Sequence, residues 1–153
     1  MRRRSLLLVA AFLLPWAASL AGAEETFRWD RLSIVTSSGE VRAFRVEIAE
    51  TPRQRSQGLQ LRRALAPDTG MLFDFETVHP VAMWMKNTFI SLDMLFLDRA
   101  GIIVHIARNT QPQSLRHISP GRPVRGVLEV NAGTAARLRI KVGDRVLHGM
   151  FGG

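Results

Sequence analysis

The sequence has 153 residues and contains no cysteine. No disulfide can form, so the folded chain must be held together by its hydrophobic core alone. The absence also excludes a lipoprotein, whose lipid is carried by a cysteine that follows the leader. The chain is long enough to form such a core, because a domain of about 130 residues buries roughly two-thirds of the surface that its unfolded chain exposes.

Motifs of several enzyme classes are also absent. No serine stands in a hydrolase nucleophile elbow, and no metal-hydrolase motif is present. A phosphate-binding loop needs a cluster of glycines that opens a helix, whereas the turn glycines are isolated: Gly70, Gly101, Gly126, Gly133 and Gly143. The chain shows no internal repeat and no linker. We therefore expect no cofactor and a single domain.

The first 23 residues have the pattern of a secretory signal peptide. Three arginines, Arg2–Arg4, precede the apolar run Leu6–Leu14, and Ala21–Ala23 is a small-x-small cleavage site. The run is short for a membrane span, which needs about 20 residues. An uncleaved anchor and twin-arginine export remain open. We predict a signal peptide over 1–23 and a β-rich domain over 24–153 that is periplasmic or secreted after cleavage near Ala23.

Basic residues are numerous but scattered along the chain. There are 21 of them against 13 acidic residues, and three of the 21 lie in the leader. They form no dense run with interleaved aromatic residues, which nucleic-acid binding would need. We therefore predict no nucleic-acid partner, membrane contact only through the signal peptide, and a largely solvated basic surface with at most a mild attraction to anionic surfaces.

Short strands dominate the chain. Apolar and polar patterning predicts strands over 31–36, 41–49, 70–75, 83–88, 92–97, 102–107 and 126–130, and residues 146–150 close the domain. Thr51 and Pro52 suit the N-cap and first position of a short helix over 52–57, which Gly58 can end. A helical turn is expected over 134–138, and an irregular loop over 109–123. The fold is predicted to be mainly β: a small β-sandwich or partly closed barrel with one or two short helices.

Three groups of residues resemble a known family. They are Gly70–Phe73, then Trp84–Thr88 with Leu92 and Asp93, and then Leu128–Gly133 with Val142–Asp144. The chain resembles the domain of unknown function 192, a family of uncharacterised bacterial and archaeal proteins. The resemblance implies a small β-rich fold and brings no established activity, cofactor or substrate.

The chain departs from the family pattern at two positions. It has Ser91 where the family usually has proline, which predicts a looser turn. It has Arg139 where the family usually has glycine, which predicts strain at the end of the helical turn.

The segment from Trp84 to Asp93 is the most unusual stretch. On a strand, both of its faces would mix polar and apolar residues, unlike a strand buried on one side. We interpret it as part of a pocket, with Trp84 as an apolar platform and Lys86 as a cation. The alternative is structural: Lys86 pairs with Asp93 or Glu129, and Asn87 bonds a turn. The predicted ligand-binding residues are Trp84, Lys86, Asn87, Asp93 and Glu129.

Three classes of function follow from these residues. The leading prediction is a non-enzymatic domain of the cell envelope that binds a small polar or anionic ligand, or an envelope protein. The second is a hydrolase or lyase in which Asp93 or Glu129 has a raised pKa and acts as acid or base. Against it, both acids stand between apolar neighbours, so alternation predicts that they point outward into solvent.

The third class is a periplasmic Cu(I)-binding protein. Two thioethers and an imidazole, from Met83, Met85 and His79, suit Cu(I), and the indole of Trp84 could shield the ion. The alternative is that both methionines are ordinary core residues.

Overall fold

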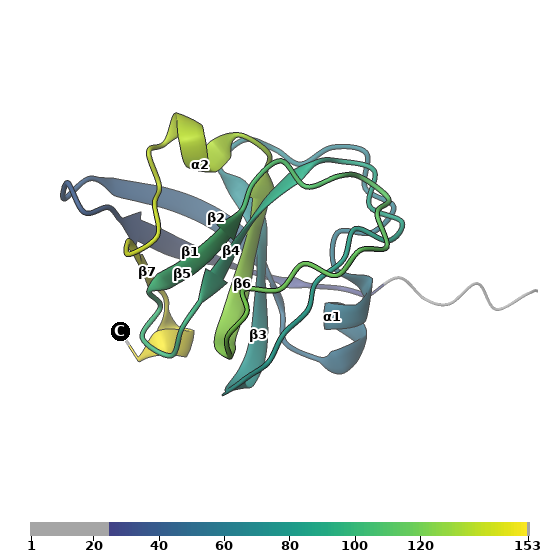
Figure 1. The fold of residues 1–153 in the computed structure, drawn as a ribbon, viewed down its shortest axis with the longest axis horizontal. Helices are drawn as coiled ribbons and strands as arrows, with labels where there is room; N and C mark the ends of the chain where they lie inside the picture. Colours follow the sequence, from purple (N-terminus) through teal and green to yellow (C-terminus); the bar gives the residue numbers. More distant parts are fainter. Residues whose placement is uncertain (1–24, 153) are drawn as a thin grey trace, which may run out of the picture.

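Seven strands form one sheet that curls into a nearly closed barrel (Figure 1). The computed structural model describes residues 25–152, so the predicted leader lies outside the described residues. The elements in chain order are β1 (Arg28–Val35), β2 (Val41–Ala49), α1 (Pro52–Gln57), β3 (Thr69–His79), β4 (Leu92–Leu97), β5 (Ile103–Ala107), β6 (Val124–Asn131), α2 (Thr134–Arg137), β7 (Arg145–Leu147) and the 3-10 turn η1 (Gly149–Phe151). The prediction of a mainly β, partly closed barrel with short helices is confirmed.

The order of strands in the sheet is β5-β4-β6-β3-β2-β1-β7. Neighbours are antiparallel except β2 and β3, which run parallel. The two ends of this order meet where Ile102 bridges Arg145, and the backbone N–H of Val146 donates to Gly101 at 2.8 Å. The barrel is closed at this point by a few bonds only. Among residues 25–152, no helix is long and apolar enough to cross a membrane.

Local sequence signals set the first half of the chain. In β2, Phe44, Val46 and Ile48 are all buried, as their alternation predicts. Thr51 caps α1 by accepting a hydrogen bond from the backbone N–H of Gln54, and Pro52 occupies the first turn. Gly58 follows with a positive φ of 49°. A side chain there would also meet the ring of Phe73 at 3.1 Å, so glycine brings α1 down onto β3.

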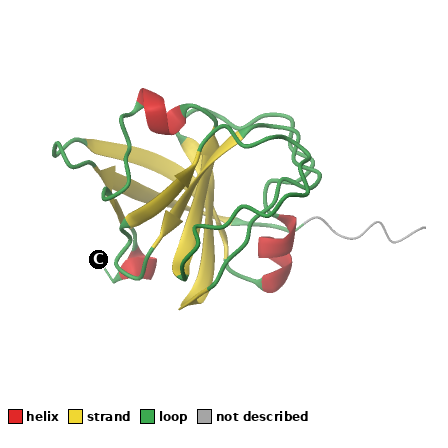
Figure 2. Cartoon of the chain, viewed as in Figure 1, coloured by secondary structure: helices red, strands yellow, loops and turns green. Residues whose placement is uncertain are grey.

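Two hydrophobic cores lie on opposite faces of the central strands. One fills the barrel and contains Phe44, Leu95 and Leu128. The other lies outside the barrel and contains Met71, Phe73 and Met85, together with loop residues. All six residues of β4 are therefore buried. Loops, drawn in green in Figure 2, cover much of this outer face.

One predicted strand does not form. Residues 83–88 make a single bridge, Met83 to Ile118, and then turn. Asn87 has a φ of 53°, in the left-handed region that a strand excludes. The backbone of this segment bonds to the loop over 110–118 instead, with Met85 N–H donating to Ser114 at 3.0 Å. The mixed faces noted in the sequence thus belong to a loop and not to a strand.

Candidate functional site

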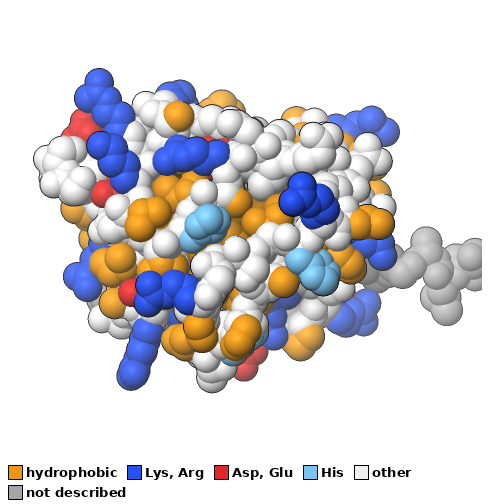
Figure 3. Space-filling model, in the orientation of Figure 1, with side chains coloured by type: hydrophobic (Ala, Val, Ile, Leu, Met, Phe, Trp, Pro, Cys, Tyr) orange, Lys and Arg blue, Asp and Glu red, His pale blue; other side chains and the backbone are white. Residues whose placement is uncertain are grey.

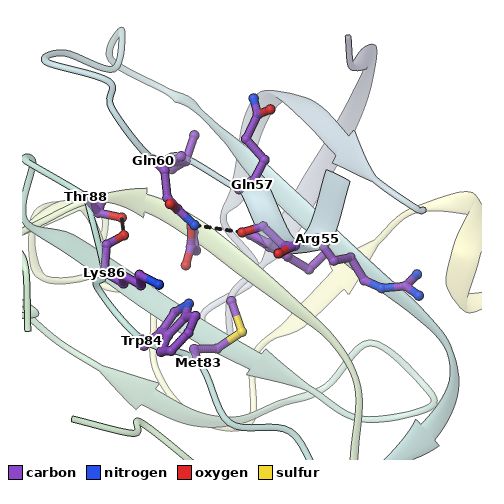
Figure 4. Close-up of a pocket in the computed structure, with 12 residues that line it drawn as sticks. Arg55, Gln57, Gln60, Met83, Trp84, Lys86 and Thr88 are labelled. Carbon is purple, nitrogen blue, oxygen red and sulfur yellow. Dashed lines mark hydrogen bonds between the residues drawn. The ribbon is translucent and has the colours of Figure 1, made fainter. Parts of the chain in front are cut away.

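A narrow cleft opens between α1 with its following turn and the segment over 83–88 (Figure 4). Its floor is formed by the outer face of β3 and β6. The cavity volume is about 30 Å³, enough for only about two or three water molecules. Only the end group of a ligand can therefore reach the floor. The lining residues are Arg55, Ser56, Gln57, Gly58, Leu59, Gln60, Phe73, Met83, Trp84, Lys86, Thr88 and Glu129.

Glu129 lies at the floor of the cleft and is only 4% exposed. Its neighbours across the sheet are Met71 on β3 and Met94 on β4. No hydrogen bond or ion pair to its carboxyl group is formed by any residue in 25–152. Burial raises the pKa of this carboxyl from 4.5 to about 8, because removal from water penalises the charged form. Glu129 is therefore protonated at neutral pH.

Glu47, a second acid in the same cross-strand row as Glu129, provides a comparison because its carboxylate has a partner within the protein. Glu47 on β2 is aligned with Met71, and Met71 is aligned with Glu129. Glu47 is buried to a similar degree, at 7% exposed. It is held by Arg62, which donates to both of its oxygens, one at 3.1 Å. Glu129 has no such partner within 25–152, and since no buried side-chain oxygen there lacks a hydrogen bond, its carboxyl oxygens are open to the cleft.

The position of Glu129 corrects the prediction that it points into solvent. The alternation is correct, and Glu129 does face away from the barrel interior. That outer face is itself buried, because loops cover it. Periodicity identifies the face of a strand, but it cannot tell what covers that face.

Trp84 and Lys86 form the mouth of the cleft. The ammonium nitrogen of Lys86 lies 5.2 Å from the centre of the Trp84 ring, in cation–π geometry. Trp84 is 44% exposed and Lys86 is exposed. Within 25–152, Lys86 takes part in no ion pair, so the predicted pairing with Asp93 or Glu129 is wrong. Trp84 and Lys86, the predicted apolar platform and cation, therefore lie together at the mouth of the cleft.

Arg55 also lines the cleft, but its charge is directed elsewhere. Its guanidinium donates to the carbonyl oxygens of Glu50 at 2.6 Å and Asp74 at 2.7 Å. In Figure 4 the head of Arg55 points away from Trp84 and Lys86. Lys86 is therefore the positive charge at the mouth that is free to meet a ligand.

Asn87 stands beside the cleft rather than in it. Its side-chain amide donates to Gln60 at 3.3 Å, and its carbonyl oxygen accepts from Leu61 N–H at 2.8 Å. These bonds join the segment over 83–88 to the turn after α1. Asn87 positions the walls, as the structural interpretation of this residue predicted.

Asp93 lies on the opposite face of the sheet and does not belong to the cleft. It is aligned with Val130, in the core inside the barrel, and is fully buried. Its two carboxylate oxygens accept from the backbone N–H groups of Asn109 at 3.0 Å and Ala135 at 2.9 Å. The prediction that Asp93 lines the same pocket is wrong. It fixes the start of α2 and the loop after β5.

The three residues of the copper hypothesis have separate environments. Met85 is fully buried, and its sulfur accepts from the Thr110 hydroxyl at 3.2 Å. Met83 lines the cleft, whereas His79 does not and bonds the carbonyl of Pro80 at 2.8 Å. No cluster of three or more His, Asp or Glu side chains that could hold a metal occurs among residues 25–152.

Sequence reasoning missed the wall contributed by α1. Gln57 and Gln60 line the cleft, and Gln60 is fixed by a bond from its amide to Ser56 at 2.7 Å. The helix itself is readable from Thr51, Pro52 and Gly58. Its packing opposite Trp84 depends on contacts between distant segments and has no local signal.

The two departures from the family pattern have different outcomes. Arg139 has a φ of 58°, in the left-handed region that glycine adopts freely, so the predicted strain is confirmed. The turn that contains Ser91 is fixed by a side-chain hydrogen bond. Its hydroxyl donates to Thr110 at 2.7 Å, which joins the turn to the loop after β5.

The molecule is a small, nearly closed seven-stranded barrel with a cleft on its outer, loop-covered face. The model of the domain of unknown function 192, described as an uncharacterised conserved family, matches residues 33–148. The chain belongs to this family. A search of curated proteins found no significant match.

Two solved structures are similar over most of the chain. The first, a protein from Sinorhizobium meliloti 1021 named as a candidate transcription regulator, has 46% identity and a TM-score of 0.81; the match covers 84% of this chain and 99% of that chain. The second, a protein of unknown function from Novosphingobium aromaticivorans DSM 12444, has 32% identity and a TM-score of 0.76; the match covers 89% of this chain and 94% of that chain.

Proposed function

We propose that this chain is an exported, non-enzymatic domain that binds the end group of a small polar or anionic ligand in the cleft. The observation that carries the proposal is Glu129: a carboxyl without a partner among residues 25–152, in a largely buried residue whose oxygens are open to the floor of a solvent-facing cleft. The same face supplies a protein partner for Glu47 but leaves the Glu129 carboxyl facing the cleft. A ligand would provide the missing hydrogen bond.

The chemistry of the cleft favours a ligand with a carboxylate or phosphate end group. A protonated carboxyl donates one hydrogen bond through its O–H, and Lys86 at the mouth supplies a positive charge. The exposed ring of Trp84 offers an apolar surface for the rest of the ligand. A cationic ligand would be repelled by Lys86 and would find Glu129 uncharged at neutral pH.

A thermal-shift screen with small carboxylates and phosphates, and with small amines as the counter-panel, tests this function. We expect stabilisation by members of the first panel. Binding should be lost in Glu129→Met, which removes the donor, and should weaken in Lys86→Met. Lys141→Met is the matched control, because Lys141 is exposed and lies outside the cleft. Equal stabilisation of wild type and Glu129→Met would contradict the proposal.

The pH dependence of binding provides an independent check. As pH rises through about 8, Glu129 becomes charged and loses its donor. An anionic ligand should then bind more weakly to wild type. Glu129→Gln keeps an N–H donor and cannot ionise, so its affinity should stay flat across the same range.

One observation favours acid–base catalysis as a second function. A carboxyl whose pKa is about 8 has a value suited to proton transfer near neutral pH. Glu129 is then the acid or base of the hydrolase or lyase that the sequence suggested, since both oxygens of Asp93 are occupied. Product formation from an ester or phosphodiester panel, lost in Glu129→Gln, would support it. Binding without product formation would favour the first function.

Export is part of the proposal and rests on the sequence pattern alone. The expected mature chain begins at Glu24 and is found outside the cytoplasm. Cell fractionation followed by N-terminal sequencing checks this. A cytoplasmic chain that retains Met1 would contradict export without affecting the cleft.

A further inference from the structure

Three loops meet at the end of the barrel where the cleft opens. They comprise residues 58–63, 83–91 and 110–119, and we call their outer side the loop surface. Leu61 N–H donates to Asn87 at 2.8 Å, and Gln113 N–H donates to Thr88 at 3.0 Å. Together with the bond from Met85 to Ser114, these hydrogen bonds hold the loops side by side at the right-hand end of Figure 1.

The loop surface is apolar to an unusual degree. Four of its large hydrophobic side chains are exposed: Leu61 at 68%, Trp84 at 44%, Phe89 at 39% and Leu115 at 66%. Two of them are the most exposed large hydrophobic residues among those described. Exposed apolar side chains that are gathered in one place indicate a surface that contacts a partner.

The charges of the loop surface are all of one sign. The three loops contain Arg62, Arg63, Lys86 and Arg116 and no acidic residue. Arg62 is paired with Glu47, which leaves three cations exposed at the surface. Two of these lie over the two exposed aromatic rings: Lys86 over Trp84, and Arg63 over Phe89 at 5.4 Å. On the face drawn in Figure 3, basic and apolar side chains are interspersed at this end, and no acidic side chain is visible there.

We propose that the loop surface docks on a bilayer that contains anionic lipids. Aromatic rings with adjacent cations suit the boundary between headgroups and acyl chains, where the ring is buried and the cation stays at the headgroups. Leu61 and Leu115 extend the apolar area, and the absence of acids removes repulsion from lipid phosphates. This contact is separate from the one that the leader would make.

A nucleic acid is the rival occupant, because basic and aromatic side chains also form stacking platforms. Two features disfavour it. Three cations are few for a backbone that is bound mainly through phosphate contacts, and exposed aliphatic tips offer nothing for base stacking. Burial of the exposed side chains of Leu61 and Leu115 is favourable in an apolar medium such as the interior of a bilayer.

Vesicle sedimentation tests the proposal, with phosphatidylcholine vesicles that contain or lack phosphatidylglycerol. The protein is the chain from Glu24 onward, so that the leader contributes nothing. This part folds on its own, since the described sheet lies within it and the match covers 99% of the similar crystallised chain. We expect binding only to vesicles with phosphatidylglycerol, and weaker binding as salt is added.

Paired variants locate the contact. Leu115→Ser with Arg116→Gln removes one exposed apolar and one basic side chain, neither of which lines the cleft. It should weaken partitioning at least about five-fold, the contribution of the charge alone. Val142→Ser with Lys141→Gln is the matched control, since Val142 is 60% exposed, and it should partition like wild type.

Three outcomes would overturn the proposal. The first is equal binding to both kinds of vesicle or to neither. The second is an equal loss in the two paired variants, which would indicate attraction through overall charge. The third is loop-dependent binding to a DNA oligonucleotide without vesicle binding. A blue shift of Trp84 emission with anionic vesicles, recorded in a Trp29→Phe background, would add support. None of these outcomes depends on the cleft ligand.

Discussion

The protonated state of Glu129 makes the stability of this protein depend on pH in an unusual direction. In the folded chain the pKa of Glu129 is raised to about 8 by burial, whereas in the unfolded chain it returns to about 4.5. Between these values, folding takes up one proton. The stabilising effect is complete below about pH 4.5, declines as pH rises, and is lost above about pH 8.

The size of the effect follows from the two pKa values. Each unit of difference corresponds to about 1.4 kcal/mol, so the shift amounts to about 5 kcal/mol in all. This is a large part of the free energy of unfolding of a typical domain, which is about 5–15 kcal/mol. Glu129→Gln keeps the shape of the side chain and removes the titration. Its free energy of unfolding should therefore match wild type at about pH 5 and exceed it by several kcal/mol at about pH 9.

Urea unfolding followed by tryptophan fluorescence, from about pH 5 to about pH 9, measures both proteins. The informative quantity is the difference between wild type and Glu129→Gln, because other groups cancel. Asp30 does not interfere, since hydrogen bonds from Arg31 and Arg28 lower its pKa and its contribution is lost only under more acidic conditions. Parallel curves for the two proteins would refute the reasoning and place Glu129 in water.

Three further predictions concern single residues. Asp93→Ala leaves the backbone N–H groups of Asn109 and Ala135 unpaired, so chemical denaturation should show a loss of about 3 kcal/mol or more; a loss below about 1 kcal/mol would mean that water replaces the carboxylate. Lys86→Met breaks no ion pair and should cost about 1 kcal/mol or less, measured in the same way, whereas a buried pair would cost about 3–5 kcal/mol. Arg139→Gly relieves a φ of 58° and should stabilise the chain by about 1 kcal/mol, seen as a higher melting temperature; an unchanged or lower value would contradict the strain.

Local patterns determined much of the fold. The ranges of β2, α1 and β4 match the predicted ones, because alternation, capping residues and turn residues act within a few positions. The first residues of β1, Arg28–Asp30, carry mixed and mostly exposed side chains, so no alternation marks them. They are held as a strand by pairing with β2. The end of β3 is exposed in the same way and was also missed.

The site was predictable only in part, for a reason that Glu129 and Asp93 illustrate. Both acids stand between apolar neighbours, and the sequence treats them alike. The structure gives Asp93 two backbone donors and gives Glu129 none within 25–152. That difference depends on which loop reaches each face of the sheet. Trp84 and Lys86 were found because they are unusual in themselves.

The outer core has a consequence for how much change its loops can accept. Surface loops usually tolerate insertions, because little is buried beneath them. Here the loop after β5 supplies Ile118 to the outer core, and its Thr110 hydroxyl bonds the sulfur of Met85. These loops act as the roof of a core. A peptide tag should be accommodated in the turn over 37–40 between β1 and β2. The same tag within 110–119 would displace the loop that covers the outer core and expose the carboxyl of Glu129 to water.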